Sequence, residues 1–152
     1  MTTLTSVVLT SLTHAEPERV WQALTATGTP MPYLHGLTVQ SNWKPGSTVT
    51  LRLDERRVPH GEVLCGEVLC GEVLAAEPCR RLSYTLGDRV ADPSVYVTWQ
   101  LSSREGSTVV HLFADEPAPY AGSYDDLELV WLRVVSALVR HLDGPPTSEV
   151  VG

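Results

Sequence analysis

The stretch that decides the fold is SYDDLELVWLRVVSALVRHLDG, residues 123–144 near the carboxyl end of the chain. Its apolar residues recur every three or four positions, which predicts an amphipathic helix with one buried face. Ser123 can cap the start of this helix, and Gly144, followed by two prolines, can stop it. About 18 residues at 1.5 Å each give a rod of roughly 27 Å, long enough to cross one face of a sheet. The predicted buried stripe comprises Leu127, Val130, Trp131, Val134, Leu138 and Leu142.

Upstream of this helix the sequence is typical of short strands. Between residues 37 and 116 apolar and polar residues alternate, and turn residues such as Pro45-Gly46 and Glu105-Gly106 separate the runs. Strands that meet at short turns pair in opposite directions, so the predicted sheet is antiparallel. The predicted strands cover residues 5–12, 37–43, 48–54, 81–86 and 95–101, followed by a partner strand that ends at Asp115.

A short helix and a loop are expected between the first two strands. Pro17 suits a first helical turn and apolar residues follow at helical spacing, which predicts a helix over residues 16–26. A glycine and two prolines then break the chain between residues 28 and 32. The loop or single turn that follows carries Tyr33 and His35.

The composition favours a single globular domain. The chain has 152 residues, and its 43% of hydrophobic residues is too high for a disordered protein. A formal net charge of −7 argues against a nucleic-acid partner, because nothing would drive the release of counterions from phosphates. No apolar run approaches the ~18 residues of a membrane span, and residues 1–11 lack the pattern of a signal peptide, so a cytoplasmic protein is expected.

Cysteine and histidine spacing gives no sign of a metal centre. The three cysteines, Cys65, Cys70 and Cys79, match neither a paired disulfide framework nor a zinc knuckle, and we interpret them as thiols in a reducing compartment. The five histidines do not stand at metal-ligand spacing, and His111 is predicted to face away from the core. We therefore predict no metal and no cofactor.

The middle of the chain contains a repeat of five residues. Gly-Glu-Val-Leu-Cys occurs at 61–65 and again at 66–70, and Gly-Glu-Val-Leu-Ala follows at 71–75. Side chains of a strand alternate with a period of two, so consecutive copies present opposite faces. Fifteen extended residues would also reach roughly 50 Å, about twice a normal strand. The repeat predicts a bulge, a bent excursion or an arm beyond the sheet, kinked at Gly66 or Gly71, and leaves open both a tolerated loop and a dimer arm.

Five segments, taken in order, form a recognisable series: PERVWQALT (17–25), NWKPG (42–46), GEVL (71–74), EPCRRLSY (77–84) and VTWQL (97–101). Together they resemble the SRPBCC superfamily, and within it the branch similar to the activator of the heat-shock ATPase chaperone. The resemblance covers about residues 5–142 and implies an α+β helix-grip fold. Such a fold has a curved antiparallel sheet of about seven strands wrapped around a long carboxyl-terminal helix, with one or two short helices after the first strand. It also implies an apolar cavity between sheet and helix.

Two features depart from the family pattern. Relatives usually reach the Gly-Glu-Val-Leu strand without extra copies, so the resemblance implies one domain over residues 1–144 with an insertion at about 61–70. Residues 145–152 are then expected to form a flexible tail. Near the end of the seventh strand relatives often carry an inward polar residue such as His, whereas this chain has Ala114, which weakens the case for catalysis in the cavity.

The sequence therefore favours the binding of a small hydrophobic or amphipathic ligand over catalysis. A cyclase-like or dehydratase-like enzyme using Tyr33 or His35 stays open as an alternative. So does an interaction module linked to a chaperone, although the eukaryotic activator has a further domain for which this chain is too short. A homodimer through the repeat segment is a further candidate assembly. The cavity candidates are Tyr33, His35, Trp43, Leu51, Tyr84, Val97, Trp99, Leu112, Trp131 and Val134.

Overall fold

The described part of the chain forms one sheet of seven strands and two helices in the computed structural model. The backbone is described for residues 4–28, 33, 37–57, 63–89, 92–117 and 124–144, and the side chains for the same residues except 4–5, 53–57, 63–68, 88–89, 92–94, 117 and 124–130. In chain order the elements are β1 (Leu4–Thr13), α1 (Pro17–Thr25), β2 (Thr38–Gln40), β3 (Thr48–Arg57), β4 (Val63–Glu77), β5 (Arg81–Arg89), β6 (Asp92–Arg104), β7 (Ser107–Pro117) and α2 (Tyr124–Asp143).

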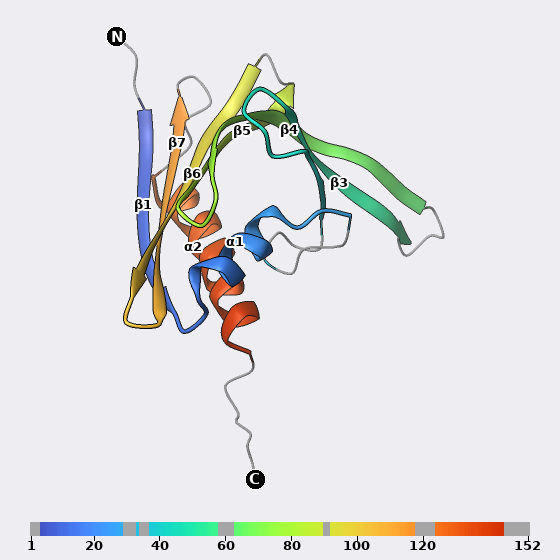
Figure 1. The fold of residues 1–152 in the computed structure, drawn as a ribbon. Helices are drawn as coiled ribbons and strands as arrows, with labels where there is room; N and C mark the ends of the chain where they lie inside the picture. Colours follow the sequence, from blue (N-terminus) through green and yellow to red (C-terminus); the bar gives the residue numbers. More distant parts are fainter. Residues whose placement is uncertain are drawn as a thin grey trace.

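The strands pair in the order β1-β7-β6-β5-β4-β3-β2, and every pair is antiparallel. Each strand from β2 to β7 lies beside its neighbour in sequence, as short turns require. The exception is β1, which pairs with β7 across the whole length of the chain. Figure 1 shows the sheet arching over both helices, so that α1 and α2 lie on its concave side. The predicted α+β helix-grip architecture is confirmed.

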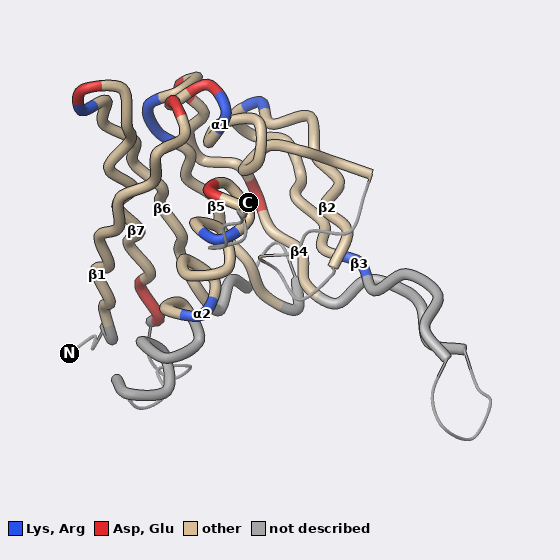
Figure 2. The backbone as a smooth tube through the Cα atoms, turned by 90° about the horizontal axis from the view of Figure 1, so that it is seen from below, with Lys and Arg blue, Asp and Glu red and all other residues tan. Residues whose placement is uncertain are grey.

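Alternation along the strands builds the core on the concave side. Trp99 is fully buried between Thr98 and Gln100, which are partly exposed, and Leu112 is buried beside the partly exposed His111. Trp131, on α2, closes the core from the helix side. In Figure 2 the described parts of strands β1, β6 and β7 carry charged residues only near their ends, so the middles of these strands are uncharged. The alternation of buried and exposed residues confirms the predicted inward face of β6 and β7.

A hydrogen-bonded latch fixes the end of α2 against the β1–α1 junction. The buried Thr13 hydroxyl donates to Asp143 Oδ1 at 2.5 Å, and the His14 amide donates to the same oxygen at 3.0 Å. Thr13 Oγ1 also accepts from the Ala15 amide at 3.2 Å, and Thr108 Oγ1 donates to the Ala15 carbonyl at 2.8 Å. The last turn of the helix is thereby tied to two strands that form one edge of the sheet.

The repeat residues that the structure describes lie in β4, a single strand of 15 residues. Its pairs with β5 begin at Cys70, whereas residues 63–69 pair with β3 alone. Figure 1 shows these ends of β3 and β4 projecting beyond the rest of the sheet. The register shifts twice along the β3–β4 pair and once, between Val73 and Ala75, against β5. This is the bulged, projecting strand that the five-residue period predicts. The predicted kink at Gly71 is wrong, because Gly71 pairs with Val49 in a regular stretch of the ladder. The extent of the insertion stays a prediction.

Several predicted strand boundaries are wrong by three residues. The strands β3 and β5 end three residues later than predicted, and β6 is longer by three residues at each end. In the other direction, the sequence predicts extended chain over residues 37–43, but β2 ends at Gln40. The reason lies at Trp43, whose φ of 57° is in the left-handed region and cannot continue a strand. The two helices agree with expectation within two residues at each end, with Glu16 and Ala26 flanking α1.

Candidate functional site

Aromatic residues from separate segments gather on the concave side of the sheet. Tyr84 comes from β5 and Trp99 from the neighbouring strand β6, and both are buried. Tyr33, between α1 and β2, is also buried, and Trp43, in the β2–β3 connection, is partly exposed. We call these four residues the aromatic cluster.

The pair Tyr84 and Trp99 is joined by a hydrogen bond inside the core. Trp99 Nε1–H donates to the Tyr84 hydroxyl at 3.2 Å. The two residues are diagonal neighbours, because Tyr84 lies opposite Val97 in the register and Trp99 is two positions further along β6. Burial raises the pKa of Tyr84 to about 12, an effect that the hydrogen bond from Trp99 opposes. At neutral pH the Tyr84 hydroxyl therefore keeps its proton.

Tyr33 is fixed to α1 by its hydroxyl, which donates to the Ala23 carbonyl at 3.1 Å. Burial raises the pKa of Tyr33 far above its usual range, and the nearby Tyr84 hydroxyl raises it further. Two neutral phenols thus lie near each other in the interior. Neither can act as a general base near neutral pH, although each can offer or accept a hydrogen bond.

Trp43 reaches the cluster from a tightly held loop. Its ring meets that of Tyr84 edge to face, with centroids 5.9 Å apart and planes inclined at 62°. Trp43 Nε1 is buried and has no hydrogen-bond partner among the described residues. A buried donor left unpaired costs about 1–3 kcal/mol, so this atom is an exception that calls for a physical explanation.

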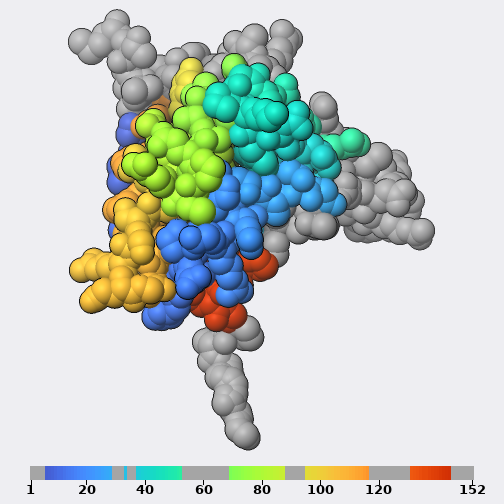
Figure 3. All heavy atoms as spheres, in the orientation of Figure 1, coloured from blue at the N-terminus to red at the C-terminus, as the bar shows by residue number. Residues whose placement is uncertain are grey.

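Backbone hydrogen bonds hold the Trp43 loop against β4. The Gly46 amide donates to the Val73 carbonyl at 2.8 Å, and the Val73 amide donates to the Ser47 carbonyl at 2.9 Å. Within the loop, Ser41 Oγ accepts from the Trp43 amide at 3.0 Å, which supports the left-handed backbone there. Figure 3 shows the residues of the β2–β3 segment lying directly against those of β4 and β5. The loop is therefore a fixed wall of the interior.

The structure buries most of the predicted cavity residues on one side of the sheet. Nine of the ten are among the described residues and belong to the core or pack against it, whereas His35 lies outside the described residues. Whether they line a ligand cavity stays a prediction. The nine are Tyr33, Trp43, Leu51, Tyr84, Val97, Trp99, Leu112, Trp131 and Val134.

Sequence reasoning missed two contributors to this interior. Val135 of α2 is as buried as its neighbour Val134, so the buried face of the helix is wider than the predicted stripe. The Ala23 carbonyl orients Tyr33, a role that no side-chain pattern can reveal. A helix held inside a curved sheet meets protein on more than one face, which explains the wider stripe.

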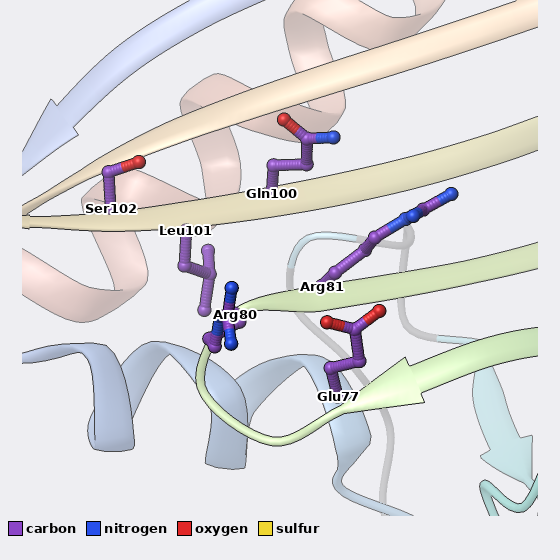
Figure 4. Close-up of a pocket in the computed structure, with 6 residues that line it drawn as sticks. All are labelled: Glu77, Arg80, Arg81, Gln100, Leu101 and Ser102. Atoms are coloured by element: carbon purple, nitrogen blue, oxygen red, sulfur yellow. The ribbon is translucent and has the colours of Figure 1, made fainter.

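A polar surface hollow of about 300 Å³ lies at the β4–β5 turn (Figure 4). Arg81 on β5 and Gln100 on β6 are register partners that alternate with the buried Leu82 and Trp99, so they lie on the other face of the sheet from the aromatic cluster. The turn is closed by the Arg80 amide, which donates to the Glu77 carbonyl at 3.0 Å, and is joined to β6 by the Leu101 amide, which donates to the Arg80 carbonyl at 2.7 Å. This hollow is separate from the aromatic interior.

Within the described residues there is no group of three or more His, Cys, Asp or Glu side chains that could hold a metal ion. Neither described helix is both long and apolar enough to cross a bilayer.

The curved antiparallel sheet holding a carboxyl-terminal helix against an aromatic interior defines a helix-grip domain, a fold of the ligand-binding kind. The chain belongs to the family described as Activator of Hsp90 ATPase homolog 1-like protein, whose model matches residues 14–143. This match confirms the resemblance to the SRPBCC superfamily and to its chaperone-activator branch. A search of the curated proteins finds no match.

Solved structures share the fold over nearly the whole chain. Protein MLL2253 from Mesorhizobium loti is 25% identical with a TM-score of 0.67, and the match covers 91% of this chain and 96% of that one. ChR145 from Cytophaga hutchinsonii is 22% identical with a TM-score of 0.64, covering 90% and 92%. The Aha1 dimer from Colwellia psychrerythraea is 16% identical with a TM-score of 0.67, covering 91% and 96%. The last two support the fold alone.

Proposed function

We propose that this protein binds a small hydrophobic or amphipathic ligand between the concave face of the sheet and α2, beside the aromatic cluster. The observation that carries the proposal is the cluster itself, in which four aromatic rings carry polar atoms within an otherwise apolar interior. Apolar and aromatic walls supply affinity for such ligands, and a few placed polar groups orient them. The remaining predicted cavity residues, His35 included, are proposed to line the same site.

Binding without catalysis fits the chemistry of the interior better than an enzyme does. Tyr33 and Tyr84 keep their protons near neutral pH, because their pKa values are raised by burial. Ala114, at the position where relatives often carry an inward polar residue, is fully buried and offers no acid or base. A cyclase-like or dehydratase-like reaction would need such a group in contact with the substrate.

An interaction with a chaperone is the second candidate, favoured by the family to which the chain belongs. A pull-down with the purified heat-shock ATPase chaperone tests it directly.

Homodimerisation through the projecting ends of β3 and β4 is a third proposal. A neighbour of the same fold is described as a dimer, and strand ends that pair with a single partner leave backbone groups for a second copy. The three cysteines, which match no paired disulfide framework, fit a protein of a reducing compartment such as the cytoplasm.

Thermal unfolding with a ligand panel tests the binding proposal. The full chain is heated alone and with fatty acids, sterols, polyketide aromatics and aromatic ketones at fixed concentration. A ligand at 100 times its dissociation constant stabilises the native state by roughly 2.7 kcal/mol, which raises the Tm by several degrees. We expect at least one class to do so. A panel that leaves the Tm of a cooperatively unfolding protein unchanged would contradict the proposal.

A further inference from the structure

Two unfavourable features coincide at Trp43. Its backbone is left-handed, with a φ of 57°, although it is not a glycine. Its indole Nε1 is buried without a partner among the described residues. Each feature is energetically unfavourable, and together they hold one donor in one place. Such a combination is typical of residues that are positioned for a ligand.

The loop geometry shows that this placement is enforced from outside the residue. Hydrogen bonds on both sides of Val73 fasten the loop to β4, and Ser47 Oγ closes it by donating to the Lys44 carbonyl at 2.6 Å. The Trp43 ring is directed at Tyr84 on β5. The loop fixes where the indole starts from the backbone, and turning its N–H toward another partner would lose the edge-to-face contact with Tyr84.

A second donor lies beside it. The Tyr84 hydroxyl oxygen accepts from Trp99 Nε1, and its own proton has no acceptor in the hydrogen bonds found among the described residues. Tyr84 contacts Trp43 through its ring, so the two side chains form one corner of the aromatic cluster. An acceptor oxygen that reaches Trp43 Nε1 would satisfy the donor that the protein leaves unpaired.

We propose that Trp43 Nε1–H is the anchoring donor for the ligand, and that the ligand class is an uncharged amphiphile carrying a carbonyl oxygen. This inference rests on the proposed function, because it places the polar end of the same ligand. A carboxylate is disfavoured, since an interior that keeps a buried phenol neutral also penalises a buried anion. A plain hydrocarbon is disfavoured too, because it leaves the indole unpaired.

Two matched probes test the inference on the full chain. The first is 2-acetylnaphthalene and the second is 2-ethylnaphthalene, which has a similar shape but no carbonyl oxygen. Satisfying a buried donor is expected to make the acetyl probe bind about 5-fold to 100-fold more tightly than the ethyl probe. In Trp43→Phe, which keeps a ring but loses the donor, the two probes should bind equally, with the ethyl probe within about threefold of its original affinity.

The matched control is Trp21→Phe, the same change in a partly exposed residue of α1. It should leave the preference for the acetyl probe intact. A second readout uses the unmodified protein. Its four tryptophans give four indole ¹⁵N–¹H signals in a nuclear magnetic resonance spectrum. The proton signal of Trp43 should lie further downfield with the acetyl probe bound than with the ethyl probe bound.

The outcomes separate the inference from the proposed function. Equal affinities of both probes for the unmodified protein, with an unmoved Trp43 signal, would overturn the inference while binding itself stands. A preference that survives in Trp43→Phe would also overturn it. If neither probe binds at millimolar concentration, both the anchoring role and the interior site for such ligands are contradicted.

Discussion

At the residue scale, the buried tyrosines are the chemical signature of the interior. Alternation along β5 and β6 predicts from sequence that Tyr84 and Trp99 face inward, and the structure agrees. Sequence could not predict their hydrogen bond, because diagonal contact depends on the register between two strands. Nor could the sequence predict the left-handed backbone of Trp43. The loop that holds this conformation is fixed by hydrogen bonds to Val73 of β4, which lies 30 residues further along the chain.

Alkaline pH should lower the free energy of unfolding, because the buried tyrosines keep their protons in the folded state. The pKa of Tyr84 is about 12 in the fold and about 10 when unfolded, so the folded state holds its proton over a range where the unfolded state releases it. The associated stability is complete below pH 10 and is lost as pH rises toward 12. We expect this residue alone to lower the free energy of unfolding by about 1 kcal/mol between pH 9 and pH 11.

Urea unfolding of the native protein and Tyr84→Phe at both pH values measures this loss. The variant should be less stable at pH 9, because Trp99 Nε1 loses its acceptor, and should lose less stability on going to pH 11. Equal losses in the two proteins would contradict the assignment of a raised pKa to Tyr84.

A second residue-scale prediction concerns the latch at Thr13. Thr13→Val keeps the shape of the side chain but removes the donor to Asp143 and the acceptor for the Ala15 amide. Because the site is buried, we expect a loss of about 1–3 kcal/mol in the free energy of unfolding. Thr10→Val is the control on the same strand, where the hydroxyl lies 3.1 Å from His111 Nδ1 in an exposed position. Its effect should stay within about 0.5 kcal/mol, and similar losses in both variants would count against the latch.

At the element scale, the repeat explains both the length and the bending of β4. Shifting the strand by five residues would bring identical residues to most positions, so the repeat itself sets the register weakly. The third copy is distinguished by what surrounds it. A Cβ at Gly71 would lie 1.7 Å from the Thr85 carbonyl oxygen, and the Glu72 amide donates to Thr85 Oγ1 at 3.0 Å. The period predicted the bulge, whereas this contact with β5 could not be read from one strand.

Gly71→Ala should therefore damage the fold. The added methyl meets backbone that cannot move without breaking the β4–β5 pairing, so we expect a loss of several kcal/mol or no cooperative unfolding at all. The matched control is Gly66→Ala, the same change one copy earlier, where the strand pairs with Leu53 of β3 and not with β5. Thermal unfolding compares them, and equal Tm values for the two variants would refute the role assigned to Gly71.

Shortening the repeat tests how much of it the sheet needs. Deleting residues 61–65 or 66–70 gives the same amino-acid sequence, with two copies in place of three. We expect this protein to unfold cooperatively with a Tm within a few degrees of the original, because the lost length lies in the segment that pairs with β3 alone.

Removing all ten residues 61–70 should cost more stability, because it also deletes Leu69, which packs against the core and pairs with Leu51.

Analytical ultracentrifugation of the original protein and the two deletion variants tests the proposed homodimer through the projecting ends of β3 and β4. Loss of the fold in the five-residue deletion would show that the projecting segment belongs to the core.

At the scale of the whole molecule, the order of elements along the chain could be predicted, but the state of the interior could not. The stripe of α2 and the alternation of the strands predict one sheet with a buried face and one helix that covers it, and the family resemblance predicts how they are arranged. Whether the enclosed side chains leave room for a ligand depends on packing at the level of single atoms. The exposed side chains Val8 and Leu12, 57% and 51% accessible on the edge strand β1, offer small apolar ligands a competing surface.

Intermolecular nuclear Overhauser effects between 2-acetylnaphthalene and the side-chain methyl groups distinguish these two places most directly. If the ligand enters between the sheet and α2, naphthyl protons should show contacts to the methyls of Val97, Leu112 and Val134, all of which are buried. Contacts confined to Val8 and Leu12 would place the probe outside the sheet and contradict the account.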